Sequence, residues 1–175
     1  MGILRSADAG QTWALIAKDS TGTRNFAGLG FSKIAFSTTN PNLVVAAAAG
    51  VATGDTEGLE NPVTVNRGLY YSLNGGVSWT FATIKDGSTV IAPGSATSVI
   101  FDANAGASGT FFAAMRFHGI YSSTDGINWT RLATQPGTGL TTLACPANPS
   151  SQNCPIYRGE FAVVPGRNEM YVCSI

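Results

Sequence analysis

A short motif occurs three times along this chain, at residues 2–13, 68–79 and 119–129. Each copy ends in one of the three tryptophans of the sequence. Every copy contains an alternating apolar stretch and a turn built from Asp, Asn and Gly, and its tryptophan begins a second stretch that continues beyond the copy. Alternation with a period of two and turns of this composition are typical of β-hairpins, so each copy predicts one hairpin.

The three copies resemble the Asp-box repeat, also called the BNR repeat, whose pattern is Ser-x-Asp-x-Gly-x-Thr-Trp. The second copy has Asn74 in place of Asp and Ser78 in place of Thr, and the third has Thr124 where Asp is expected, with Asp125 beside it, so we expect a distorted third turn. The predicted motif residues are Ser6, Asp8, Gly10, Thr12 and Trp13; Ser72, Asn74, Gly76, Ser78 and Trp79; and Ser122, Asp125, Gly126 and Trp129. The resemblance implies a β-propeller like those of sialidases, xyloglucanases, sortilin-type receptors and many bacterial proteins.

The aspartate of such a motif is a structural residue. A short carboxylate or amide accepts hydrogen bonds from the backbone N–H groups of its own turn, while glycine takes the positive φ. The indole then packs between neighbouring sheets, where its burial removes about 150–250 Å² from water. We therefore expect Trp13, Trp79 and Trp129 to be buried, and we do not interpret Asp8 or Asp125 as catalytic acids.

Three other strand pairs follow the motif copies, one after each copy. They are at 31–36 with 43–47, 98–101 with 111–114, and 161–164 with 170–172. In the families that the motif resembles, the motif sits at the turn between outer strands C and D of a blade, so these pairs are the inner strands A and B. The sequence therefore predicts a partial all-β β-propeller of four-stranded antiparallel blades, with an outer half blade at 1–18, blades at 28–84 and 96–134, and an inner half blade at 159–175.

This arrangement leaves a bare strand edge at each end of the arc. Propellers close with about 4–8 blades, and the N-terminal outer half lacks the inner half that the C-terminal segment offers. One hypothesis is a homodimer in which two chains exchange halves and close a six-bladed ring. The other hypothesis is a fragment of a longer propeller, and the sequence leaves both open.

Charge and hydropathy narrow the range of partners. Ten basic and ten acidic side chains cancel and are scattered along the chain, which disfavours nucleic acid and anionic membranes. No apolar run approaches the roughly 20 residues of a membrane helix, and the N-terminus lacks the apolar core of a signal peptide. We expect no nucleic-acid or membrane partner.

The cysteines predict one disulfide. Cys145 and Cys154 flank a loop rich in Pro and Asn, and a bridge between them would tie the base of that loop. A bridge would favour an extracytoplasmic or secreted location, whereas two free thiols would suit the cytosol. Cys173 lies on a strand-like stretch, where we expect a buried small apolar side chain.

The connections from B to C and from D to A share one face of a propeller, where propeller ligands usually bind. The ligand-binding residues that we predict on this face are Arg24, Arg67, Arg116, His118, Tyr157, Arg158 and Glu160. Arginine forks suit carboxylates, and three of these arginines occupy comparable positions before a strand. The face is thus interpreted as a surface for a glycan or a protein, although Arg158 and Glu160 are also typical of an ion pair that caps a strand.

The sequence assigns no catalytic residue. The Arg-Ile-Pro segment and the Tyr–Glu pair of sialidases are not found, and a xyloglucanase-like reaction needs two facing carboxylates. Asp19, Asp86 and Glu160 lie on the expected face, but nothing around them marks an acid. We therefore favour a non-catalytic binding module, with a glycoside hydrolase, or half of one, and a gene fragment without activity as the alternatives.

No cofactor or metal is predicted. The loop at 50–66 carries Asp55, Glu57 and Glu60, whose oxygens suit Ca²⁺, but their spacing matches no known ligand pattern and favours a solvated loop. His118, the single histidine, does not make a zinc site with the two loop cysteines unless the loops converge.

Overall fold

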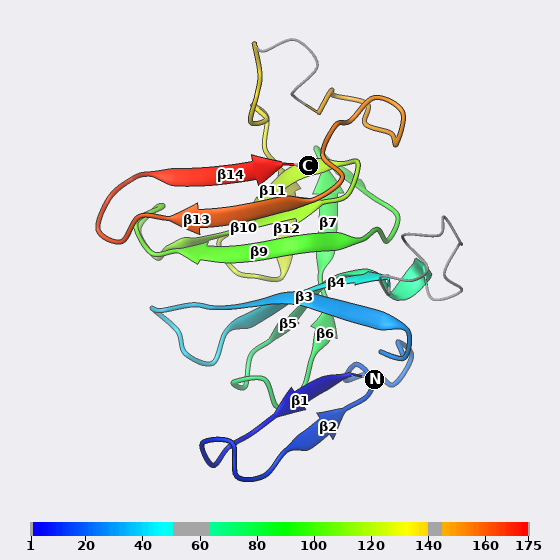
Figure 1. Ribbon diagram of the computed structural model, residues 1–175, viewed down its shortest axis with the longest axis vertical. Coiled ribbons are helices and arrows are strands. Elements are labelled where there is room, and N and C mark those ends of the chain that lie inside the picture. Colours follow the sequence, from blue (N-terminus) through cyan, green and yellow to red (C-terminus); the bar gives the residue numbers. More distant parts are fainter. Residues whose placement is uncertain (1, 51–63, 140–144, 175) are drawn as a thin grey trace.

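The computed structural model describes residues 2–50, 64–139 and 145–174, and Figure 1 shows an all-β chain whose sheets stand side by side. The helical content of these residues is one short 3₁₀ helix, η1 (Thr64–Asn66), and no helix among them is long and apolar enough to cross a membrane. The prediction of an all-β chain is therefore confirmed. The strands are β1 (Ile3–Arg5), β2 (Ala14–Ile16), β3 (Leu29–Phe36), β4 (Val44–Gly50), β5 (Gly68–Ser72), β6 (Thr80–Phe81), β7 (Thr83–Asp86), β8 (Thr89–Val90), β9 (Ala96–Asp102), β10 (Thr110–Met115), β11 (Gly119–Ser123), β12 (Asn128–Arg131), β13 (Gly159–Val163) and β14 (Met170–Ser174).

Blade 1 is the antiparallel sheet β3-β4-β5-β6. Its second strand, β4, is buried along its whole length because both faces of this strand are covered. Val45 and Ala47 belong to the core shared with the next sheet, whereas Val44 and Ala46 belong to the core shared with β1 and β2. Alternate residues of one strand thus pack against different neighbours, as the period of a β-strand requires.

Blade 2 comprises β9, β10, β11 and β12, and its sheet continues into two further strands. The sequence predicted four strands, but the observed order is β8-β7-β12-β11-β10-β9. β7 leaves blade 1 and pairs in parallel with β12, with Trp129 opposite Ile84. Because β6 is only two residues long, the chain crosses early to blade 2 and covers the outer edge of β12, which would otherwise be exposed. The predicted limit of blade 1 at residue 84 consequently falls inside β7.

The two ends of the chain form half-sheets. β1 pairs with β2 in the N-terminal half-sheet, and β13 pairs with β14 in the C-terminal half-sheet. In Figure 1 these half-sheets lie on opposite sides of the two blades. Within the described residues neither half-sheet contains a third strand.

The exposed fractions of the three tryptophans differ because the sheets beside them differ. Trp79 is 2% exposed and belongs to the core between the N-terminal half-sheet and blade 1, and Trp129 is fully buried between blades 1 and 2. Trp13 is 60% exposed, so the prediction that it is buried was wrong. Each buried indole packs toward the preceding sheet, and no sheet of the described chain precedes the N-terminal half-sheet.

The three motif turns are held by their own side chains. In the first, Gly10 N donates to Ser6 Oγ at 2.7 Å and Thr12 N donates to Asp8 Oδ1 at 2.9 Å. In the second, the equivalent donors reach Ser72 Oγ at 2.8 Å and Asn74 Oδ1 at 2.9 Å. Glycines at positive φ follow in all three turns, as predicted.

The third turn corrects one prediction. Gly126 N donates to Ser123 Oγ at 2.9 Å, and Asn128 N donates to Asp125 Oδ1 at 2.8 Å. The serine of this copy is therefore Ser123 and not Ser122. Counted from Ser123, Asp125 holds the same position as in the other copies, and one residue is missing after it. The turn is one residue shorter than the other two, which is a distortion of the kind expected there, and it keeps its hydrogen bonds to the serine and the aspartate.

The structure contains the disulfide between Cys145 and Cys154, with the two Cα atoms 4.3 Å apart. Both residues are buried in a small core with Ile120, Ile156 and others, which joins the loop to blade 2. Cys173 is exposed, so the prediction that it is buried was wrong. It lies on β14, whose outer face no described strand covers.

Candidate ligand-binding face

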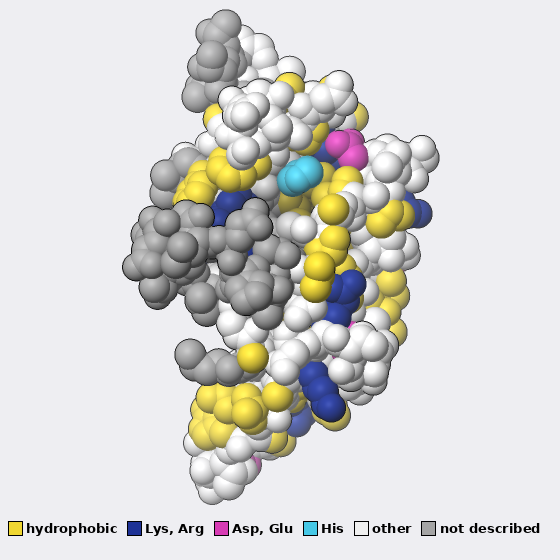
Figure 2. Space-filling view, turned by 90° about the vertical axis from the view of Figure 1, so that its right-hand side faces the viewer, with side chains coloured by type: hydrophobic (Ala, Val, Ile, Leu, Met, Phe, Trp, Pro, Cys, Tyr) yellow, Lys and Arg dark blue, Asp and Glu magenta, His cyan; other side chains and the backbone are white. Residues whose placement is uncertain are grey.

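Figure 2 shows one face of the chain, on which basic side chains, the histidine and apolar side chains are interspersed. Arg24 lies between β2 and β3, Arg67 directly before β5, and Arg116 between β10 and β11. Tyr157 and Arg158 directly precede β13. This face carries the ends of strands and the connections between them, so its side chains are held by the sheets.

Arg24 has the most defined environment of these residues. Its guanidinium carbon lies 3.7 Å from the centroid of the Phe81 ring, and its Nη1 donates to the carbonyl of Val65. Asp19 accepts the backbone N–H of Arg24 at 3.1 Å and thereby fixes the loop that carries it. A stacked guanidinium with a fixed hydrogen bond is restricted before any ligand arrives.

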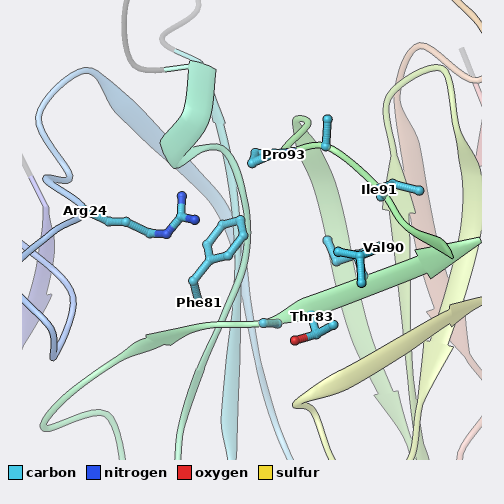
Figure 3. A pocket seen from close by; sticks show the side chains of 9 residues that line it. Arg24, Phe81, Thr83, Val90, Ile91 and Pro93 are labelled. Carbon is cyan, nitrogen blue, oxygen red and sulfur yellow. The ribbon is translucent and has the colours of Figure 1, made fainter.

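A cavity of about 240 Å³ adjoins this stacked pair. Figure 3 shows Arg24 and Phe81 on one side and Val90, Ile91 and Pro93 on the other. The wall is mostly apolar and is formed by both blades, because the β7–β8 hairpin leaves blade 1 and joins blade 2. Pockets at such junctions, apolar with few polar groups, are typical ligand sites.

A second arginine also stacks on an aromatic ring. The guanidinium carbon of Arg116 lies 4.3 Å from the centroid of Tyr157, and the Phe117 ring meets the same tyrosine edge-on at 5.7 Å. Tyr157 remains 39% exposed. Aromatic rings with an apolar body and a polar tip are enriched at binding surfaces.

Arg67 and Arg116 do not occupy equivalent positions. Arg67 directly precedes Gly68, which pairs with Ala48, and His118 directly precedes Gly119, which pairs with Met115. The counterpart of Arg67 in blade 2 is therefore His118. The Nε of Arg67 and the Nδ1 of His118 are buried without a hydrogen-bond partner among the described residues.

His118 lies beside Arg131, whose side chain is largely buried. Partial burial, followed by the positive charge of Arg131, lowers the pKa of His118, while Asp86 acts in the opposite direction. Arg131 donates from Nε to the His118 carbonyl at 2.8 Å and from Nη2 to the carbonyls of Cys145 and Pro146 at 3.1 and 2.6 Å. Its side chain thus ties β12 to the disulfide loop. The lowered pKa favours the neutral imidazole, which is suited to hydrogen bonding rather than to ion pairing.

Glu160 forms an ion pair with Lys33, a residue that was not among the predicted site residues. Its carboxylate contacts Lys33 Nζ at 2.6 Å and accepts the Ser98 hydroxyl at 3.3 Å. Partial burial opposes ionisation, but the hydrogen bond and charge of Lys33, the Ser98 bond and the charge of Arg158 together lower the pKa of Glu160. The partners of Glu160 at hydrogen-bond distance are Lys33 and Ser98, so the predicted Arg158–Glu160 cap is wrong as a direct pair.

The other acidic candidates also have local partners. Asp19 is buried and accepts the Thr21 hydroxyl at 2.8 Å, and Asp86 lies 4.0 Å from the Arg131 Nε. Asp55, Glu57 and Glu60 lie outside the described residues. Within residues 2–50, 64–139 and 145–174, no group of three or more His, Cys, Asp or Glu side chains is arranged to hold a metal ion.

Sequence reasoning missed Phe81, Lys33 and the β7–β8 hairpin. Phe81 stands two residues after the second motif, at the position held by Arg131 after the third, so an alignment of the copies marks it as variable. Lys33 becomes a neighbour of Glu160 only through the stacking of sheets, because 127 positions separate them. No local pattern signals such a contact.

Comparison with solved structures gives an informative likeness. No protein-family model matches this chain, and no curated protein matches it either. The crystal structure of an ancestral GH74 enzyme, a β-propeller glycoside hydrolase, is similar with 26% sequence identity and a TM-score of 0.54. The match covers 78% of this chain but spans only 16% of that enzyme. Together with the observed sheets, this likeness confirms the prediction of a β-propeller fold.

Proposed function

We propose that this chain is part of a β-propeller of the glycoside-hydrolase type and that it binds a glycan without cleaving it. The binding surface is the face that carries Arg24, Arg67, Arg116 and Arg158. The observation that carries the proposal is the cavity beside the Arg24–Phe81 stack, which lies on that face. The likeness to a GH74 enzyme supports a glycan over a protein as the ligand.

The size and chemistry of the cavity suit a sugar ring. A cavity of about 150 Å³ holds one six-membered ring, and this one measures about 240 Å³. The apolar wall from Val90 to Pro93 fits the C–H face of a sugar, and the guanidinium of Arg24 and the hydroxyl of Thr83 supply polar groups at its border. Arg24 is already stacked and hydrogen-bonded, so less side-chain entropy is lost on binding.

The repeated turns support the propeller assignment itself. Their shared hydrogen bonds, from glycine to serine and from the Thr12 position to the Asp8 position, support a set of three Asp-box repeats. In this proposal Asp8 and Asp125 shape turns on the face opposite the binding surface and take no part in chemistry.

Hydrolysis is the second candidate because the similar structure is an enzyme. A general acid in a glycosidase has a raised pKa, whereas Glu160 has a lowered pKa and a lysine at 2.6 Å. These properties do not suit Glu160 to the role of the general acid. A fluorogenic glycoside that the chain cleaves, with the activity lost in Glu160→Gln, would replace the binding proposal by the hydrolase.

The binding proposal is tested with immobilised xyloglucan, cello- and sialyl-oligosaccharides, followed by calorimetric titration of any oligosaccharide retained. We expect Arg24→Ala to weaken binding about 10- to 100-fold, because a hydrogen bond to a charged group contributes about 1.5–3 kcal/mol. The matched control is Arg167→Ala, which removes an exposed arginine paired with Glu169 in the β13–β14 turn. Retention of no oligosaccharide, or equal loss in both variants, would contradict the proposal and favour a fragment without activity.

A further inference from the structure

An exposed aromatic ring lies outside the cavity beside Arg24. Tyr157 stands two residues before β13 and is 39% exposed. The guanidinium carbon of Arg116 lies 4.3 Å from the centroid of its ring, and the Phe117 ring meets its edge with the centroids 5.7 Å apart. The tyrosine ring is therefore held from two sides and still presents surface to solvent.

The loop that holds this ring has an unfavourable backbone conformation. Phe117 has a φ of 57°, and within the described chain Ala9 is the other residue besides glycine with a positive φ. Such a φ is unfavourable for an aromatic residue, persists only where the surrounding structure enforces it, and is common at ligand sites. Two hydrogen bonds enforce it here: His118 N donates to the Met115 carbonyl at 3.0 Å, and Phe117 N donates to the Ile156 carbonyl at 2.7 Å. The second bond joins the loop to the segment that carries the exposed ring.

A disulfide anchors that segment from below. Cys154 lies three residues before Tyr157, is buried and is bridged to Cys145. Ile156 is 1% exposed and belongs to the same small core as the two cysteines. The exposed tyrosine thus stands on a buried base, so little loop and side-chain entropy is lost when a ligand covers its ring.

The exposed ring and the cavity beside Arg24 are joined by a short segment. Pro93 lines the cavity, and the carbonyl of Ser95, two residues further along, accepts the Arg116 N–H at 2.9 Å. Two residues of chain span at most about 7 Å, and the Arg116 side chain reaches from there over Tyr157. The cavity and the ring therefore lie on neighbouring connections between strands, close enough for several linked sugar rings to reach both.

We infer that Tyr157 forms a second subsite, which takes a further ring of the glycan whose first ring occupies the cavity beside Arg24. The second subsite rests on the proposed function of that cavity and adds the class of ligand, which is an oligosaccharide rather than a monosaccharide. The apolar C–H face of a sugar ring packs on the exposed part of the tyrosine ring. Arg116 and Phe117 are positioning residues, because they fix the orientation of the ring on which the sugar packs.

Calorimetric titration with cellobiose and cellohexaose tests the second subsite. We expect cellohexaose to bind about 10-fold more tightly, because only the longer sugar reaches both subsites and one aromatic contact contributes about this factor. Tyr157→Ala should remove this gain and leave the affinity for cellobiose unchanged, whereas Tyr157→Phe, which keeps the ring, should preserve the gain. Tyr171→Ala is the matched control, because it removes a tyrosine that is 62% exposed on β14.

A failure of the second subsite is distinguishable from a failure of the cavity. If neither sugar binds, the cavity beside Arg24 is not a site for this class of glycan, and the second subsite falls with it. If both sugars bind equally tightly, or if Tyr157→Ala and Tyr171→Ala have the same effect, the cavity stands and the second subsite alone is overturned. A Tyr157→Phe variant as weak as Tyr157→Ala would overturn packing of the sugar on the ring.

Phe117→Gly tests the positioning role. Glycine adopts a positive φ readily, so the turn is kept while the ring that contacts Tyr157 is removed. We expect weaker binding of cellohexaose, with the affinity for cellobiose and the β-sheet spectrum unchanged. A general loss of structure would lower the affinity for both sugars, and that result, or an unchanged preference for cellohexaose, would overturn the positioning role.

Discussion

The whole blades and the N-terminal half-sheet carry the same turn in different surroundings. The indole N–H donates to the glycine carbonyl of the motif at 3.1 Å for Trp13, 3.1 Å for Trp79 and 2.9 Å for Trp129. The exposed fractions of the three residues are nevertheless 60%, 2% and 0%. The turn therefore forms from local hydrogen bonds, whereas burial of the indole depends on a neighbouring sheet.

The largest effect that we expect separates the tryptophans by stability. Trp129→Ala should lower the free energy of unfolding by about 3–5 kcal/mol, because it leaves a cavity between two blades. Trp13→Ala should lower it by about 0.5 kcal/mol or less, as for other exposed positions. Urea denaturation, at a concentration where light scattering gives single chains, measures both changes. Equal losses would mean that the turn itself, and not the neighbouring sheet, gives the indole its contribution to stability.

The second prediction compares the two ends of the chain. The C-terminal half-sheet shares its core with the disulfide loop, and the N-terminal half-sheet has no such link among the described residues. Replacing Cys145 and Cys154 by Ala should lower the free energy of unfolding by about 2–3 kcal/mol, which is the contribution expected from a disulfide that closes a short loop.

Hydrogen exchange locates this loss. We expect the amides of β13 and β14 to exchange faster in the variant, while those of β1 and β2 stay unchanged. Cys173→Ala is the control, because that thiol is exposed and unpaired within the described chain. Faster exchange at both ends alike would show that the disulfide stabilises the whole fold.

A smaller effect concerns the contact between the inner strands of blade 1 and the C-terminal half-sheet. The Lys33 and Glu160 side chains are both 42% exposed, so water screens their attraction. A double-mutant cycle should therefore give a coupling energy of about 0.2–1 kcal/mol between the two side chains. The pKa of Glu160 is lowered, so this contribution is present above the usual glutamate pKa and fades as the pH falls through the lowered value. A coupling that persists after protonation would assign the contact to packing.

The smallest expected change is confined to one turn and compares Asp8 with Asn74. Hydrogen bonds from the Thr12 hydroxyl, the Thr12 amide and Ser6 lower the pKa of Asp8 to about 2. Because the folded pKa lies below the unfolded value, the contribution of this carboxylate is complete above about pH 4 and is lost as the pH falls through about 2.

Amide chemical shifts measure this difference. The Thr12 amide should report a titration near pH 2, whereas the Ser78 amide, bound to the uncharged Asn74 side chain at 2.9 Å, should not titrate. A common midpoint for both amides would indicate global unfolding rather than protonation of one turn.

Much of the fold could be predicted because its signals are local. The turn residues of the three copies, the inner strand pairs and the loop disulfide all follow from residues close in sequence. Ser123 was missed because a one-residue deletion after Asp125 shifts the pattern, and two adjacent serines fit either alignment. The sequence predicted which connections between strands carry the candidate residues, but it did not predict the contacts that those residues make. Phe81 meets Arg24 across 57 positions and Glu160 meets Lys33 across 127.

The sequence by itself determined the hairpins, their turn chemistry and the all-β class, because period-two alternation and side-chain-to-backbone hydrogen bonds act over a few residues. Only the tertiary structure decided which indole is buried, where the β7–β8 hairpin pairs and which residues line the cavity beside Arg24. Those outcomes depend on how sheets stack, and stacking joins residues that have no relation along the chain. Trp13 shows the distinction most directly: its turn is complete, and its ring is exposed for want of a neighbouring sheet.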